Sequence, residues 1–349
     1  MMPEDNEPLR YHTLGNGQRN FLVTVGVSLR VTSKFYFGAS LSHENTALRL
    51  RYARDTALEA GHGPQGIESD CGGSPCGLEN PEATELYDVD VASPRLATEN
   101  LKVQLGTVFS PYPDMWIGIA YHTPPGLGIQ ATYDGTMDVT RAPRDGGDVI
   151  HGGASVNVSF PASVDGEVRA RVVEDLELHV GVRWEDLSRM QAYDVRGYAS
   201  TFRDAGIPEW TLRPRGLKDA VAAWAGVEQY DRGQLFRLGA RLGFETSSVS
   251  RQRTSPLTIG PPKLSIDIGG QLRLGPWTAQ LSYWIELSPQ VSVEDSAFDP
   301  RSRLECLDTL DYSSPACEAT RNGYAIPTAD GDYNRLDHAL RLGFRYEYR

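Results

Sequence analysis

The sequence has no long apolar run. Of its 349 residues, 40% are hydrophobic, and no stretch reaches the roughly 18 consecutive apolar residues that indicate a transmembrane helix. The composition is therefore too polar for a helical membrane protein. A Gly-rich phosphate loop, a zinc-type Cys/His cluster and a nucleophile elbow are also missing. We therefore expect no cofactor and no bound metal.

Basic residues are also in short supply. The chain carries 34 Lys and Arg against 46 Asp and Glu, a formal net charge of −12, which argues against a nucleic-acid partner. Five of the seven histidines are scattered without an obvious catalytic partner nearby in the sequence: His43, His122, His151, His179 and His338. Because no Ser-His-Asp or paired-acid arrangement is visible, we do not expect an enzyme and assign no catalytic residue.

What the sequence does contain is alternation, most clearly in residues 336–349. Successive side chains of a strand point to opposite faces. One face of this segment is apolar and ends in aromatics: Leu340, Leu342, Phe344, Tyr346 and Tyr348. The other face is polar: Arg341, Gly343, Arg345, Glu347 and Arg349.

The same alternation recurs along the chain, for example at 176–185, 236–245, 264–273 and 277–286. Each segment is close to the 9–11 residues, roughly, with which a strand crosses a bilayer. A soluble β-sandwich also alternates. Here, however, charged residues and glycine fill the polar face of strand after strand, as in a wet lumen. The sequence predicts an all-β fold, a transmembrane antiparallel β-barrel in the outer membrane of a Gram-negative bacterium.

Loop lengths support this topology. We expect about eleven strands, at 20–31, 34–45, 99–110, 114–134, 153–172, 176–190, 216–229, 234–246, 263–274, 277–290 and 335–348. Tight turns alternate with long loops, which lie at 46–98, 135–152, 191–215, 247–262 and 291–334. Outer-membrane barrels place short turns in the periplasm and long loops outside the cell.

The strand count also bears on the N-terminal end. Strand 20–31 runs into a periplasmic turn, so residues 1–19 are expected on the extracellular side. The odd count and the lack of a signal peptide in Met1 to Arg10 lead us to expect that the sequence begins in mid-barrel, with a leader and further strands upstream. An open sheet edge in lipid would leave backbone groups unpaired.

The four cysteines fall in two of the long loops. Cys71 and Cys76 lie in the first of them, and Cys306 and Cys317 lie in the last. Both loops are predicted to face the oxidising side of the membrane, so two local disulfides are the natural expectation. Free thiols or a metal site are the alternatives.

Three segments are distinctive in their order: 115–124 (Met-Trp-Ile-Gly-Ile-Ala-Tyr-His-Thr-Pro), 158–190 with Pro161 and Trp184, and the hairpin with Lys218-Asp219, Gly226, Tyr230, Arg237 and Gly239. From about Asn20 to its end, the chain resembles the FadL/TodX family of outer-membrane transporters for long-chain fatty acids and hydrophobic compounds. His122 and Thr123 replace the family's Arg-Ser pair, and the terminal Phe is absent.

By this resemblance, the eleven strands would be the last of the family's fourteen, and the N-terminal hatch that plugs the lumen would be missing. It implies uptake of long-chain fatty acids or other small hydrophobic compounds. It also implies a monomer that contacts outer-membrane lipid and is inserted by the barrel-assembly machinery. A general porin and an inactive truncated barrel fragment remain alternatives, and the sequence does not name the cargo.

A lumen for such cargo should offer apolar surface beside a few fixed cations. Six inward-facing residues meet that description: Arg237, Arg241, Arg183, His179, Trp224 and Trp284. One hypothesis is that the arginines contact a ligand headgroup while the tryptophans flank its tail. The other is that the arginines pair with lumen carboxylates and hold the barrel rigid.

Overall fold

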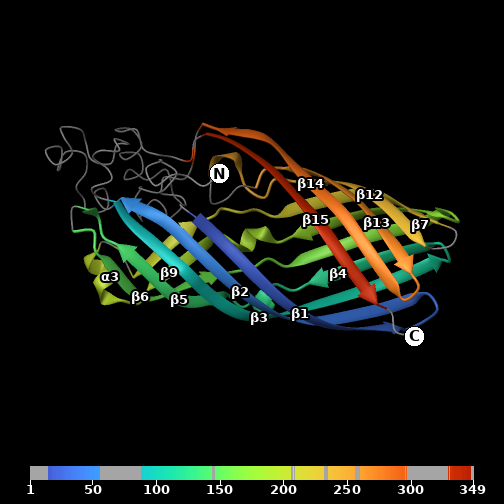
Figure 1. Ribbon diagram of the computed structural model, residues 1–349, viewed down its shortest axis with the longest axis horizontal. Coiled ribbons are helices and arrows are strands. Elements are labelled where there is room, and N and C mark those ends of the chain that lie inside the picture. The colour runs from blue at the N-terminus through green and yellow to red at the C-terminus, as the bar shows by residue number, and fades with distance from the viewer. Residues whose placement is uncertain are drawn as a thin grey trace.

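The computed structural model is a single curved antiparallel sheet of 15 strands (Figure 1). It describes residues 15–55, 88–143, 146–205, 207, 209–231, 235–255, 260–294, 296, 329 and 331–346. None of the helices in these ranges is long and apolar enough to cross a bilayer. The predicted fold class, an all-β antiparallel barrel-like sheet, is confirmed. The four cysteines lie outside the described residues.

The strands follow one another along the chain with few other elements between them. They are β1 (Gly15–Arg30), β2 (Phe35–Asp55), β3 (Asp88–Tyr112), β4 (Met115–His122), β5 (Ala131–Thr140), β6 (Val149–Val158), β7 (Ser163–Val173), β8 (Leu176–Glu185), β9 (Ala192–Gly197), β10 (Trp210–Pro214), β11 (Ala220–Tyr230), β12 (Phe236–Glu245), β13 (Lys263–Leu274), β14 (Trp277–Val293) and β15 (Gly331–Tyr346). A short helix, α3 (Ser200–Asp204), lies between β9 and β10.

Each predicted strand has a counterpart, but two of them are broken in two. The predicted strand 114–134 is divided into β4 and β5, and 153–172 into β6 and β7. The chain also breaks between β8 and β9 and between β10 and β11, where β9 and β10 lie in the predicted loop 191–215. Proline explains two of the breaks, because it cannot donate a ladder hydrogen bond. Pro124 and Pro125 precede Leu127, whose φ is +57°, and Pro161 separates β6 from β7.

The strand limits also correct the predicted loops. The strands β2 and β3 extend to Asp55 and from Asp88, well inside the predicted loop 46–98. The predicted loop 191–215 contains β9, α3 and β10. Strand β3 is long enough to pair with β4 along one part and with β5 along another. The strands β5, β6, β9 and β10 therefore continue the sheet beyond β4, β7, β8 and β11. We call the part of the sheet that contains β5, β6, β9 and β10 the upper part, and the part that contains β4, β7, β8 and β11 the lower part.

The sheet branches at β3, and its ends are β1, β10 and β15. Strand β1 pairs with β2, and β15 pairs with β14, both antiparallel. No ladder joins β1 to β15 among the residues that the structure describes. The sheet curls in Figure 1 like a barrel wall and is not closed.

Below the breaks, the convex face is apolar. On β8, Leu178, Val180 and Val182 are 44%, 60% and 48% exposed. Aromatics mark the limits of this belt. Trp184 lies near the breaks, and Trp277 contacts Tyr346 at the end with short turns, with ring centroids 4.8 Å apart and ring planes tilted by 57°. An apolar outward band flanked by aromatic rings is the pattern of a β-barrel wall in lipid.

Above the breaks, the polarity of the two faces is exchanged. On the concave face of β2, Ser40 and Ser42 near the middle give way to Leu48, Leu50 and Tyr52. These residues join a buried apolar cluster that includes Leu48, Leu50, Tyr52, Val89, Val91, Leu96, Tyr133, Met137, Val139, Val156, Val195 and Phe202. The core of the molecule therefore lies inside the upper part of the sheet.

The helix α3 completes this core. Phe202 is 1% exposed and rests on two glycines of the sheet. A side chain at Gly152 or Gly197 would place its Cβ only 2.5 or 2.8 Å from the Phe202 ring, below any van der Waals distance. Only glycine allows the ring to seat here.

The exchange of polarity predicts a position-dependent cost for a new charge. We expect Val180→Arg, in the middle of the apolar belt, to lower the free energy of unfolding by about 2–4 kcal/mol. Thr132→Arg, on the convex face above the breaks, should cost less than about 1 kcal/mol, because its surroundings are polar. Urea titration in phospholipid vesicles measures both. Equal losses of unfolding free energy would contradict the assignment of Val180 to an apolar belt and of Thr132 to a polar surface.

Candidate functional site

Register pairing arranges the concave side chains in rows that run across the strands. One row joins Glu167, Gly181, Trp224 and Gly243 on β7, β8, β11 and β12. The next row comprises Arg169, His179, Gly226, Arg241, Asp267 and Trp284. Below it follow Arg171, Glu177, Glu228, Gly239, Gly269 and Ser282. A final row contains Tyr230, Arg237, Gln271 and Gln280.

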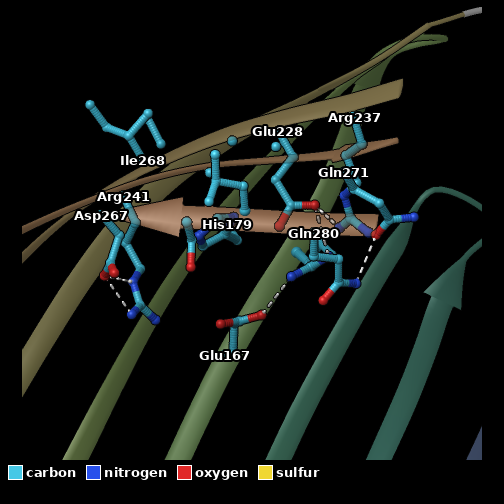
Figure 2. A pocket seen from close by; sticks show the side chains of 16 residues that line it. Glu167, His179, Glu228, Arg237, Arg241, Asp267, Ile268, Gln271 and Gln280 are labelled. Carbon is cyan, nitrogen blue, oxygen red and sulfur yellow. Dashed lines mark hydrogen bonds and ion pairs between the residues drawn. The ribbon is translucent and has the colours of Figure 1, made fainter. Parts of the chain in front are cut away.

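A cavity of about 390 Å³ opens on these rows, lined by residues of β7, β8 and β11 to β14. Its floor is formed where Gly239 and Gly269 are direct neighbours. Longer side chains of the rows above and below surround this bare stretch of backbone. Figure 2 shows Arg241 and Asp267 on one side and Arg237, Gln271 and Gln280 on the other. The cavity is thus a depression made by two adjacent glycines.

Both arginines predicted to contact a headgroup are already paired. Arg241 donates to Asp267 Oδ2 from Nη2 at 2.7 Å and from Nε at 3.1 Å. Arg237 forms an ion pair with Glu228 and lies 4.8 Å from the centroid of the Tyr230 ring. The cavity lining balances three arginines against three carboxylates (Arg169, Arg237, Arg241; Glu167, Glu228, Asp267). The cavity therefore carries no net charge.

A denser network lies next to the cavity, toward the short turns. Glu177 is buried and accepts hydrogen bonds from Arg171 at 3.0 Å and from the Tyr230 hydroxyl at 2.8 Å. Arg169 lies 3.6 Å from Glu177 and 3.3 Å from Glu228. Charges from β7, β8 and β11 are thus tied together along the concave face.

His179 is the least exposed residue of the cavity that can hold a charge. It is 7% exposed, and its Nδ1 has no hydrogen-bond partner. Trp224 lies beside the cavity, where it donates from Nε1 to Glu167 Oε2 at 3.1 Å. The Arg241 guanidinium lies 5.8 Å from the centroid of its ring.

The other two predicted residues lie apart from the cavity. Arg183 donates to Asp165 at 2.5 Å, and Asp165 also contacts His122 at 2.7 Å. Trp284 is opposite Asp267 in register, is partly exposed and is not among the lining residues. The structure therefore brings Arg237, Arg241 and His179 together, with Trp224 adjoining them.

Sequence reasoning missed several residues of the wall. Asp267, Gln271 and Gln280 fall on the polar faces of the alternating segments 264–273 and 277–286, but no role was predicted for them. Glu167 and Arg169 were not singled out. Only the hairpin formed by β13 and β14 has a sequence feature from which such a contact could have been predicted. The two residues Gly275 and Pro276 join β13 to β14, and such a short turn fixes register, so that Gln280 donates to Gln271 at 3.1 Å. Within the described residues, no group of His, Cys, Asp or Glu could hold a metal ion.

The charge network yields a stability prediction. Glu177→Ala should lower the free energy of unfolding by about 3 kcal/mol, the lower end for a buried ion pair that loses one partner, because its arginines keep some access to water. Glu174→Ala, in the exposed turn three positions away, is the matched control and should be near neutral. Urea titration in vesicles provides the measurement, and an equally small loss for both would show that the network does not stabilise the sheet.

No protein-family model and no curated protein matches the sequence. Solved structures match by fold. A Pseudomonas aeruginosa FadL homologue superposes with a TM-score of 0.69 at 12% identity, covering 96% of this chain and 69% of that one. The Pseudomonas putida toluene transporter TodX gives 0.57 at 15% identity, covering 80% and 66%. The Ralstonia pickettii toluene transporter TbuX gives 0.58 at 14%, covering 96% and 70%.

The chain thus spans about two thirds of the length of these structures. The identities are low, so the likeness concerns the fold, which is the level at which the resemblance noted in the sequence is confirmed. The chain has the fold of the FadL homologue and of the toluene transporters TodX and TbuX.

Proposed function

We propose that this chain forms the wall of an outer-membrane channel through which small hydrophobic molecules pass. The fold shared with a FadL homologue and two toluene transporters carries the proposal. The apolar belt on the convex face supports it, because such a belt suits contact with outer-membrane lipid. Insertion by the barrel-assembly machinery and a monomeric state belong to the same proposal.

The apolar side chains of the concave face above the breaks are buried, since Leu96, Val139 and Val156 are each 0% exposed. They form a packed core and leave little surface for a hydrophobic molecule. Below the breaks, the concave face is polar and its charges are paired. A hydrophobic molecule that enters there would meet no extended apolar surface that retains it.

The pairing of the arginines favours uncharged cargo over long-chain fatty acids. A free arginine would hold a carboxylate by charge-assisted hydrogen bonds. In this cavity, Asp267 already occupies Arg241, and Glu228 already occupies Arg237. A fatty-acid carboxylate would have to displace one of these partners, whereas an aromatic hydrocarbon would not.

Uptake by cells tests the proposal. The full chain is produced in a Gram-negative host without a hydrocarbon transporter of its own, and uptake of radiolabelled toluene, palmitate and maltose is measured. We expect toluene uptake above the empty-vector background, with less palmitate and no maltose. Maltose uptake would indicate a general porin instead. Uptake of none of the three would refute the proposed channel.

A variant and its control test the preference for uncharged cargo. Asp267→Asn removes the charge that occupies Arg241, so palmitate uptake relative to toluene should rise about tenfold, the equivalent of one hydrogen bond to a charged group. Asp165→Asn frees Arg183 in the same way but outside the cavity and should leave the ratio unchanged. The same ratio in both variants would mean that Arg241 does not meet the cargo.

A further inference from the structure

Two large side chains of the concave face lie over glycines of the neighbouring strand. Gly181 on β8 is the register partner of Trp224 on β11. A Cβ at Gly181 would fall 2.6 Å from Trp224 Nε1 and closer still to carbons of the ring. The indole therefore occupies the space that any other residue at this position would fill with its own side chain.

The hydrogen bond of Trp224 shows which way the ring extends. Its partner Glu167 is on β7, and Glu167 is the register partner of Gly181 on the side away from β11. The indole thus reaches from β11 across β8 to β7. It lies along the wall and does not project into the lumen.

The next row repeats the arrangement in the opposite direction. Gly226 on β11 is the partner of His179 on β8, and a Cβ at Gly226 would lie 2.5 Å from His179 Cε1. His179 lines the cavity, is 7% exposed and leaves its Nδ1 without a partner. In this row, the ring comes from β8 and the glycine from β11, the reverse of the row with Trp224 and Gly181. Neither ring therefore stands up from the wall.

A methyl group at Gly181 would disturb this arrangement. Carbon atoms in contact prefer a separation of about 3.5–4 Å, so the indole would have to move by roughly 1 Å or more. The sheet lies beneath the ring, so we expect the ring to rise toward the lumen, past the Arg241 guanidinium that lies 5.8 Å from its centroid. The bond to Glu167 would be lost as the ring rises.

We propose that Gly181, by holding Trp224 flat on the wall, and Gly226, by doing the same for His179, set the free width of the lumen and so the size of the molecules that pass. The size limit rests on the proposed function, whereas the seating of Trp224 does not. The chain offers a matched control in Gly118. It also faces the lumen and neighbours Glu167 in register, but a Cβ there would meet nothing closer than 3.9 Å.

Uptake of toluene and of the larger naphthalene tests the size limit in the full chain. Gly181→Ala should lower naphthalene uptake relative to toluene about tenfold, while Gly118→Ala should leave the ratio unchanged. The effect should vanish in the Trp224→Ala background, because without the ring the added methyl group displaces nothing. A persisting loss in that background, or the same loss for Gly118→Ala, would overturn the size limit.

Fluorescence tests the seating without any transport. The contribution of Trp224 is the difference between a protein and its Trp224→Phe variant. Acrylamide quenching of this contribution should rise about twofold in Gly181→Ala, since the wall covers one of the two ring faces in the native arrangement. Unchanged quenching in a folded Gly181→Ala protein would overturn the seating even if transport is found.

The two sets of measurements separate the possible failures. A native protein that takes up neither molecule would refute the proposed function and the size limit together. Increased quenching would still establish the seating. Gly226→Ala is not the primary variant, because its Cβ would also lie 2.8 Å from the carbonyl oxygen of Ala240 and could disturb the backbone.

Discussion

The two-residue period of a β-strand gives this sheet two faces, and their polarity is exchanged along its length. On the concave side of β2, Ser40 and Ser42 are followed by Leu48 and Leu50, while the convex side passes from Leu41, which is 51% exposed, to the exposed Arg49. The breaks in four neighbouring passes mark this transition. They separate a lower part built like a wall in lipid from an upper part with an internal apolar core.

This exchange of polarity explains how far the sequence could be interpreted. Alternation at 176–185 and 236–245 was enough to predict strands, and both are found at nearly those limits. Alternation alone does not tell which face is inside. The strands β9 and β10 and the upper parts of β2 and β3 lie in segments that were predicted as loops. Residues 192–197 show the limit most clearly. This short segment is a strand because it pairs with β6 on one side and β10 on the other, and partners so distant in the chain leave no local signal.

The sequence predicted which side chains face the lumen, but it did not predict which of them contact one another. Arg237 and Arg241 were placed on the inner face, and both hypotheses about them were stated. Asp267 was not recognised as the partner of Arg241, because β12 and β13 are joined through residues 246–262, a connection too long to fix register. The tight turn between β13 and β14 does fix it, and the contact of Gln271 with Gln280 follows. The glycine seats are likewise a property of register, since Gly181 is meaningful only opposite Trp224.

Charge pairing and glycine seating have the same mechanical effect. Arg241 reaches sideways to Asp267 on the next strand, and Trp224 reaches across β8 to Glu167. In each case, a partner on a neighbouring strand holds a long side chain down along the wall. A lumen filled with unpaired long side chains would be closed by their motion, and an apolar lumen would retain hydrophobic cargo. A wall with paired charges and bare glycines does neither, so the polar character of the lower lumen is compatible with the proposed passage of hydrophobic molecules.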